Sequence, residues 1–244
     1  MRRSIQSLLN DRTSGASALF HALLQELSHL DEDEFRLALF ELQQTFPAMA
    51  VWKYLDTYFA NRSFTKKHIQ DLKTLAALEK ARVLDGTSKT LSAYTSFLTL
   101  SQSSLVTSFF EQRAEQEKIY VVCSESLPGL EGRALTKTLN SKGVTTRCVQ
   151  DWTLVEELAN SEAVLFGADW VTDDFVVNKQ GSREVVDRAI QDDKPVFFLA
   201  EAFKHTEPVD FKREWCYQDW SEGDIQRRIK VFDIIPRSEG LIIL

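Results

Sequence analysis

Residues 163–182 read AVLFGADWVTDDFVVNKQGS, and the interpretation of the chain starts from this stretch. It opens with an apolar run, 163–166, that is short enough for one buried strand. Gly167 then lets the backbone turn, so that Asp169 stands just past the end of the strand. A second β-branched run, 175–177, precedes a polar loop and a helical pattern. The stretch therefore predicts a strand, a loop and a helix in succession.

Polar groups follow the second run at Asn178, Lys179, Gly181 and Ser182. In an open parallel sheet, ligands bind outside the carboxyl ends of the strands. The Gly181-Ser182 pair also opens a helix, whose free N–H groups attract anions. Together with Asp169, the stretch offers a carboxylate, an amide, an ammonium group and a helix N-terminus to one ligand. The alternative is an ordinary strand–loop–helix in which Asn178 and Lys179 only hold the loop.

The composition is that of a globular protein, with 43% hydrophobic residues among 244. The net charge of −7 argues against nucleic acid as a partner, because such binding needs a concentrated basic face. No segment approaches the ~20 apolar residues of a membrane span. No export signal is evident at the N-terminus either, so we expect a cytoplasmic protein that does not bind membranes.

Cofactor and metal motifs are absent from the sequence. The three cysteines, Cys123, Cys148 and Cys216, show no CxxC pair, and the four histidines are scattered without metal-ligand spacing. No GxGxxG follows a strand pattern, and no GxxxxGK[ST] occurs. We therefore expect no metal and no cofactor.

The first part of the chain, residues 1–90, carries helical patterns only, which predicts a helical domain. The second of its helices should begin near Ser14 or Gly15. A later helix should be capped by residues 63–65. The run Asp85-Gly86-Thr87-Ser88 has turn composition and predicts the boundary of this domain.

Residues 91–244 alternate short apolar runs with helical patterns, which predicts a Rossmann-like, doubly wound, mainly parallel α/β domain. The expected strands are 97–100, 119–123, 144–149, 163–166 and 195–200, with closing strands at 231–235 and 241–244. Because the exits of parallel strands lie along one edge of a sheet, the polar residues that follow the strands should meet there. These residues are Ser101, Gln102, Ser103, Glu125, Ser126, Asp169 and Glu201.

Several short motifs occur in the order of a known family. They are LTLSQS at 98–103, ESLP at 125–128 with Gly132, GAD at 167–169, NKQG at 178–181, AE at 200–201 with FK at 203–204, and FD at 232–233 with Pro236. On these motifs the chain resembles the translation initiation factor 2B alpha/beta/delta regulatory-subunit family. That family includes methylthioribose-1-phosphate and ribose-1,5-bisphosphate isomerases. The run DRTSGA at 11–16 resembles the family's first helix-entry turn, so the resemblance covers most of residues 11–244.

The resemblance implies a helical domain, a Rossmann-like domain, and a phosphosugar or other phosphate-bearing ligand between them. It also implies homodimers formed largely through the C-terminal domains. The candidate ligand-binding residues are Arg12, Gly15, Gln102, Ser103, Arg133, Asn178, Lys179, Gly181, Ser182 and Glu201.

Two departures from the family pattern affect the chemistry. In the isomerase branches, a cysteine after the first strand works with the GAD aspartate. Here the aspartate is present as Asp169, but Ser101 stands at the cysteine position. A thiol titrates near ~8.5, whereas an alcohol is a far weaker acid that needs an adjacent base, and no histidine occurs between residues 95 and 185. In addition, Leu127 stands where many members carry an arginine that helps to bind phosphate. Arg133 or Arg12 could supply that charge instead.

Three functions are therefore open. The first is an initiation-factor-2B-like regulatory protein that binds a phosphosugar or a nucleotide without catalysis. The second is a sugar-1-phosphate aldose–ketose isomerase that uses Asp169 with Ser101 or a water molecule as its partner. The third is an interaction subunit in which the motif residues are only structural.

Overall fold

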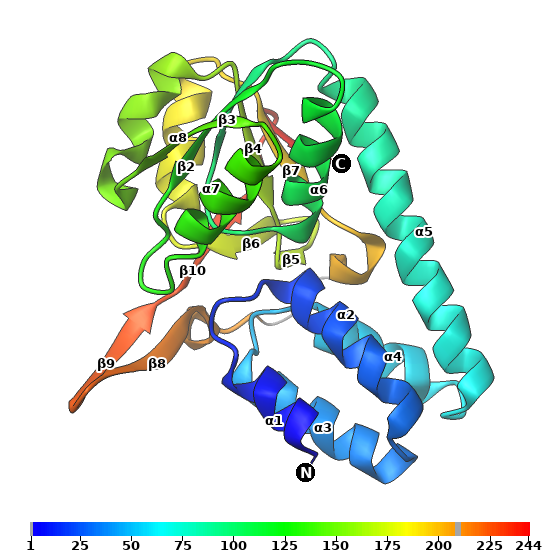
Figure 1. Ribbon diagram of the computed structural model, residues 1–244. Helices are drawn as coiled ribbons and strands as arrows, with labels where there is room; N and C mark the ends of the chain where they lie inside the picture. Colours follow the sequence, from blue (N-terminus) through cyan, green and yellow to red (C-terminus); the bar gives the residue numbers. More distant parts are fainter. Residues whose placement is uncertain (1, 208–210) are drawn as a thin grey trace.

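Helices make up the first part of the chain. The structure is a computed structural model that describes residues 2–207 and 211–244. The helices are α1 (Arg3–Asn10), α2 (Ala16–Glu26), the 3-10 turn η1 (Leu27–His29), α3 (Glu32–Thr45), α4 (Val51–Ala60) and α5 (Lys66–Thr90). In Figure 1, α1 to α4 lie together in one group, and α5 runs from this group along the side of the α/β part. No helix within the described part of the chain is both long and apolar enough to cross a membrane.

Residues 85–88 form no turn, contrary to their composition, because α5 continues through this run to Thr90, the last residue of the predicted helical domain. The helix is held by tertiary packing rather than by local propensity. Val83 and Leu84 are buried against the sheet, and the Thr87 hydroxyl donates to the Val83 carbonyl at 2.7 Å. This burial outweighs the cost of about 1 kcal/mol that Gly86 imposes on a helix interior. The predicted cap of the same helix is confirmed, since Thr65 accepts from the His68 amide.

A six-stranded, all-parallel sheet forms the centre of the rest of the chain, in the order β11-β7-β4-β1-β2-β3. Its strands are β1 (Ser96–Thr99), β2 (Tyr120–Ser124), β3 (Thr145–Val149), β4 (Ala163–Gly167), β7 (Val196–Leu199) and β11 (Leu241–Ile243). The helices between them are α6 (Ser104–Ala114), α7 (Glu131–Ser141), the 3-10 helix η2 (Asp151–Asn160) and α8 (Ser182–Gln191). This confirms the predicted doubly wound α/β fold.

Side-chain alternation along the strands explains why both faces of the sheet are covered. In β4, for example, Leu165 packs with α6, α7 and the end of α5, whereas Val164 and Phe166 pack with η2 and α8. Successive residues of a strand point to opposite faces, so a strand buried on both faces has a continuous apolar run. The run at 163–166 has this character.

Two smaller sheets were not anticipated from the sequence. The first is antiparallel, in the order β10-β6-β5, and consists of β5 (Trp170–Val171), β6 (Phe175–Lys179) and β10 (Phe232–Pro236). Only three residues connect β5 to β6, and so short a connection permits antiparallel pairing only. The second is a hairpin of β8 (Tyr217–Glu222) and β9 (Ile225–Lys230), which projects from the body in Figure 1. The short 3-10 turns η3 (Ala202–Lys204) and η4 (Arg213–Cys216) precede it.

The helical group packs onto the β10-β6-β5 sheet, so the two parts of the chain share one hydrophobic core. Residues of α1 to α4 bury their apolar faces together with Trp170, Val177 and Phe232. Phe20 of α2 stacks on Phe203 of η3 with ring centroids 4.2 Å apart. The carboxyl ends of the strands in the main sheet therefore lie close to the start of α2.

Two glycine substitutions test this packing. Gly86→Ala should raise the free energy of unfolding by about 0.5–1 kcal/mol, because alanine is the better helix former and a Cβ at this position meets no atom within 4 Å. Gly132→Ala should lower it by at least about 2 kcal/mol, because a Cβ there would lie 1.8 Å from the Ser124 carbonyl oxygen. Urea unfolding followed by circular dichroism measures both free energies. Similar effects of the two variants would contradict the open surroundings of Gly86 and the close contact at Gly132.

Candidate functional site

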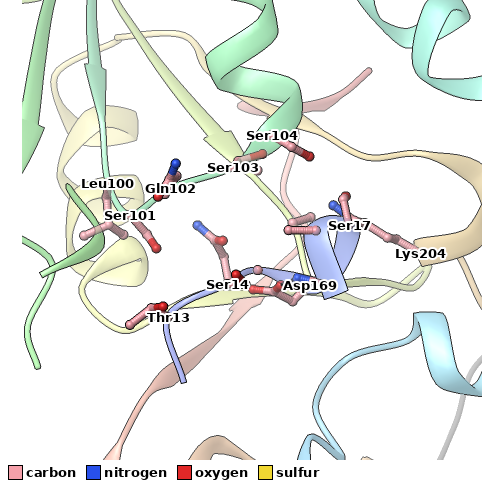
Figure 2. Close-up of a pocket in the computed structure, with 16 residues that line it drawn as sticks. Thr13, Ser14, Ser17, Leu100, Ser101, Gln102, Ser103, Ser104, Asp169 and Lys204 are labelled. Carbon is pink, nitrogen blue, oxygen red and sulfur yellow. Dashed lines mark hydrogen bonds between the residues drawn. The ribbon is translucent and has the colours of Figure 1, made fainter. Parts of the chain in front are cut away.

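A polar cavity of about 130 Å³ lies where the carboxyl edge of the main sheet meets the start of α2. Its walls come from the α1–α2 loop and the first turn of α2 (residues 13–18), the β1–α6 turn (100–104) and the GAD turn (167–169). Asn178 and Lys204 complete the lining. Figure 2 shows Ser103 and Ser104 on one side of this main cavity, with Asp169 across from them and Ser17 and Lys204 beside them.

Asp169 connects the sheet to the helical group. Its Oδ1 accepts from the Ala16 amide at 3.1 Å, and its carbonyl oxygen accepts from the Ala50 amide at 3.1 Å. The N-cap of α2 is Gly15, which has no side chain that could cap the helix, so the Asp169 carboxylate performs this role from another part of the chain. Burial raises the pKa of the Asp169 carboxyl, and the nearby Lys204 and the Ala16 amide reduce this effect.

Lys204 is held at the cavity wall by a buried ion pair. Its Nζ lies 3.1 Å from Oε2 of Glu201, a side chain with no exposed surface. The Ser17 hydroxyl donates to the same carboxylate at 3.0 Å. Glu201 thus orients two lining residues without lining the cavity itself. The sequence interpretation missed Lys204 as a site residue, although the FK that follows AE in the family motif was the available signal.

The β1–α6 turn brings three more predicted residues to the cavity. Ser101, Gln102 and Ser103 all line it. Ser101 adopts a left-handed φ of 64°, and its amide donates to Oγ of Ser126 at 2.7 Å. The Ser103 hydroxyl is buried and has no hydrogen-bond partner among the described residues. Gly167 allows this arrangement, because a Cβ at its position would lie 2.5 Å from Oγ of Ser103.

The predicted phosphate position at the start of α8 is already taken by a carboxylate of the protein. Oδ2 of Asp233 accepts from the amides of Gly181 at 2.7 Å and Arg183 at 3.2 Å. Ser182 is buried, and its hydroxyl accepts from Nδ2 of Asn178 at 2.9 Å. Gly181 and Ser182 therefore stabilise the loop through hydrogen bonds within the protein, and neither lines the main cavity.

Two other predicted features lie away from the main cavity. Arg133 pairs with Glu125 on the surface and does not line the main cavity. Leu127, at the position of the family's arginine, is 46% exposed. The turn between β2 and α7 therefore supplies no cation to the site.

A second cavity of about 40 Å³ adjoins the first. The two share Ser101, Asp169 and the loop residues 13–15. Two of the predicted cations line the second cavity. Lys179 lies there in a buried ion pair with Glu131, and Arg12 donates to the Leu9 carbonyl at 2.6 Å while its guanidinium lies over the Phe46 ring.

The main cavity thus combines groups suited to an anion with groups suited to hydroxyls. The first turns of α2 and α6 both begin at its wall, and helix N-termini favour negative charge. Asp169, Gln102 and Asn178 offer hydrogen-bond partners for hydroxyl groups. No cluster of residues that could hold a metal ion occurs in the part of the chain that the structure describes.

Asp169→Asn should make the protein more stable near pH 7, because it removes a buried charge and keeps an oxygen that can cap α2. The raised pKa means that ionising Asp169 costs more in the folded than in the unfolded state. The wild-type free energy of unfolding should therefore fall, relative to that of the variant, as the pH rises from 3.8, the ordinary pKa of an aspartate, to the raised pKa of the folded state. Below pH 3.8 the difference should become small, because Asp169 is then protonated in both the folded and the unfolded state.

Thermal unfolding between pH 3.5 and 7.5 measures this effect. Asp169→Ala is the control, since it removes both the charge and the cap and should cost about 1 kcal/mol relative to Asp169→Asn at every pH. An asparagine variant that is less stable than wild type near pH 7 would contradict the proposed balance between burial and capping.

Comparison with known proteins places the chain in a family. The model of the Initiation factor 2 subunit family matches residues 43–231. A translation initiation factor eIF-2B subunit 2-like protein of Pyrococcus abyssi is 28% identical over 234 residues, which cover 91% of this chain and 83% of that protein.

Two solved structures share the fold. The crystal structure of translation initiation factor eIF-2B from Pyrococcus horikoshii OT3 has a TM-score of 0.79 at 23% identity, with 97% of this chain and 92% of that chain covered. The structure of 5-methylthioribose 1-phosphate isomerase from the same organism has a TM-score of 0.67 at 16% identity, with 96% and 79% covered. Because the family model matches well over half of this chain, the chain belongs to the Initiation factor 2 subunit family.

Proposed function

We propose that this protein is a regulatory member of its family, which binds a small phosphate-bearing sugar or nucleotide in the main cavity without isomerising it. The observation that carries the proposal is the convergence of two helix N-termini, those of α2 and α6, on one cavity that also contains Asp169 and Lys204.

Phosphate recognition is assigned to the side of the cavity where the two helices begin. The amides of the first helical turn have no acceptor within the helix, and that of Ala16 alone is used by Asp169. The remaining first-turn amides of α2 and α6 are therefore available to phosphate oxygens. The unpartnered hydroxyl of Ser103 adds a neutral donor. Lys204 lies in the same wall, but the buried carboxylate of Glu201 offsets its charge, so the amides and Ser103 supply the hydrogen bonds to phosphate.

Hydroxyl recognition is assigned to Asp169 and the two amide side chains. Oδ1 of Asp169 is used by Ala16, and its other oxygen has no hydrogen bond among the described residues. A carboxylate oxygen accepts from hydroxyls, and the amides of Gln102 and Asn178 can both donate and accept. A molecule that carries both a phosphate and hydroxyls matches this set.

The groups beside Asp169 do not favour catalysis. The Ser101 hydroxyl needs a base in order to act, and neither cavity is lined by a histidine among the described residues. Cys123 does not replace the missing thiol, because it lies fully buried in β2 and burial raises the pKa of its thiol. The retained Asp169 is the observation that favours the alternative function, an aldose–ketose isomerase of sugar 1-phosphates. A purely structural interaction subunit is the third possibility.

We propose a cytoplasmic protein that forms homodimers through its α/β part, as the family resemblance implies. The net charge of −7 argues against nucleic acid as the ligand.

Ligand-induced thermal stabilisation tests the binding function. Ribose 5-phosphate should raise the melting temperature, since a ligand at 100 times its Kd stabilises a protein by about 2.7 kcal/mol. Ser103→Ala should leave the ligand-free melting temperature unchanged or higher, because it removes an unpartnered buried hydroxyl, and should weaken ligand binding about threefold to tenfold. Ser141→Ala, a surface change in α7, serves as the control. If no phosphosugar or nucleotide stabilises the protein, the interaction-subunit function is favoured instead.

Ketose formation separates the binder from the isomerase. We expect no turnover of methylthioribose 1-phosphate or ribose 1,5-bisphosphate, even at high enzyme concentration, because no thiol from the described residues lines either cavity around Asp169. Ser101→Cys restores the missing group and is the variant in which weak turnover should first be detected. Turnover by the wild type that Asp169→Asn abolishes would establish the isomerase.

A further inference from the structure

The inner wall of the second cavity contains a buried ion pair. Nζ of Lys179 lies 2.9 Å from Oε1 of Glu131, and the two side chains are only 9% and 5% exposed. Because the pair is buried, the charge of Lys179 is offset by a fixed carboxylate rather than by solvent. Lys179 is therefore a poor partner for an incoming phosphate.

The same carboxylate has an unused acceptor. Oε2 of Glu131 is buried without a hydrogen-bond partner among the described residues, although Glu131 lines the second cavity. A buried polar atom without a partner is costly, and a ligand that donates a hydrogen bond would remove this cost. The vacant acceptor therefore points to a donor group on the ligand.

The other charges that face the second cavity are those of Arg12 and Asp169. Arg12 is exposed, so water and salt screen its charge, and it already donates to the Leu9 carbonyl. Asp169 and Glu131 are both buried. A phosphate in this cavity would thus meet two buried carboxylates at its inner end and one screened cation at its mouth.

The second cavity has room for a small group. Its volume of about 40 Å³ exceeds the ~10–15 Å³ that one water requires. Because it shares Ser101 and Asp169 with the main cavity, a ligand that contacts Asp169 can reach both.

From these contacts we infer that the second cavity is a subsite for a sugar hydroxyl that donates to Glu131, and that Glu131 excludes a second phosphate. The protein therefore selects sugar monophosphates over bisphosphates. This inference rests on the proposed function, in which the main cavity binds the one phosphate.

Calorimetric titration with two matched probes tests the selectivity. Ribose 5-phosphate and ribose 1,5-bisphosphate differ only in whether C1 carries a hydroxyl or a phosphate. Wild-type protein should bind the monophosphate at least tenfold more tightly. Glu131→Gln should reduce this ratio at least tenfold, mainly because the bisphosphate binds more tightly once Lys179 is released from its partner.

Two further variants complete the experiment. Glu125→Gln makes the same chemical change at a carboxylate that pairs with Arg133 outside both cavities, and it should keep the wild-type ratio. If Glu131→Gln fails to fold because Lys179 is left unpaired, the double variant Glu131→Gln/Lys179→Met removes both charges and should also lose most of the discrimination.

The outcomes separate this inference from the proposed function. Binding of neither sugar phosphate would overturn both. Tight binding of the monophosphate with equal binding of the bisphosphate, or a ratio that Glu131→Gln leaves unchanged, would overturn only the selectivity role of Glu131.

Discussion

One carboxylate joins the two parts of this molecule. Asp169 stands at the carboxyl edge of the main sheet, accepts from the Ala16 amide through its side chain, and accepts from the Ala50 amide through its carbonyl oxygen. The starts of α2 and α4 are thereby fixed against the GAD turn. A capping hydrogen bond of this kind contributes about 1 kcal/mol, which is appreciable beside the 5–15 kcal/mol that stabilises a typical protein. The cavity exists because this contact holds α2 at the sheet edge.

Around Asp169, internal partners offset the buried charges. Glu201 holds Lys204, Glu131 holds Lys179, and Asp233 binds both the start of α8 and Lys230. Such pairs add little net stability, but the loss of one partner is costly. Their consequence here is chemical, since they determine which donors remain for a ligand. The donors that remain belong to the first turns of α2 and α6 and to Ser103.

The family membership describes a shared framework rather than one activity. The same fold occurs in an initiation factor and in an isomerase, at identities of 23% and 16% with this chain. Function on a shared fold depends on the side chains of the site. By the family resemblance, Ser101 stands at the cysteine position of the isomerase branches and Leu127 at a position where many members carry arginine, while Asp169 is kept. That combination supports the proposal of a binding protein.

The sequence by itself determined the α/β architecture and the meeting of Ser101, Gln102, Ser103 and Asp169 at one sheet edge. Both follow from local periodicity, because alternating β and α patterns force the strand exits to one side. Local patterns failed at residues 85–88, where the packing of Val83 and Leu84 extends α5 through a sequence with turn composition. Only the tertiary structure decided which helix N-termini are free and which carboxylate pairs with each buried lysine. Asp233 lies about fifty residues beyond the α8 start that it caps, and Glu131 lies about fifty residues before Lys179, so no spacing in the sequence reveals either contact.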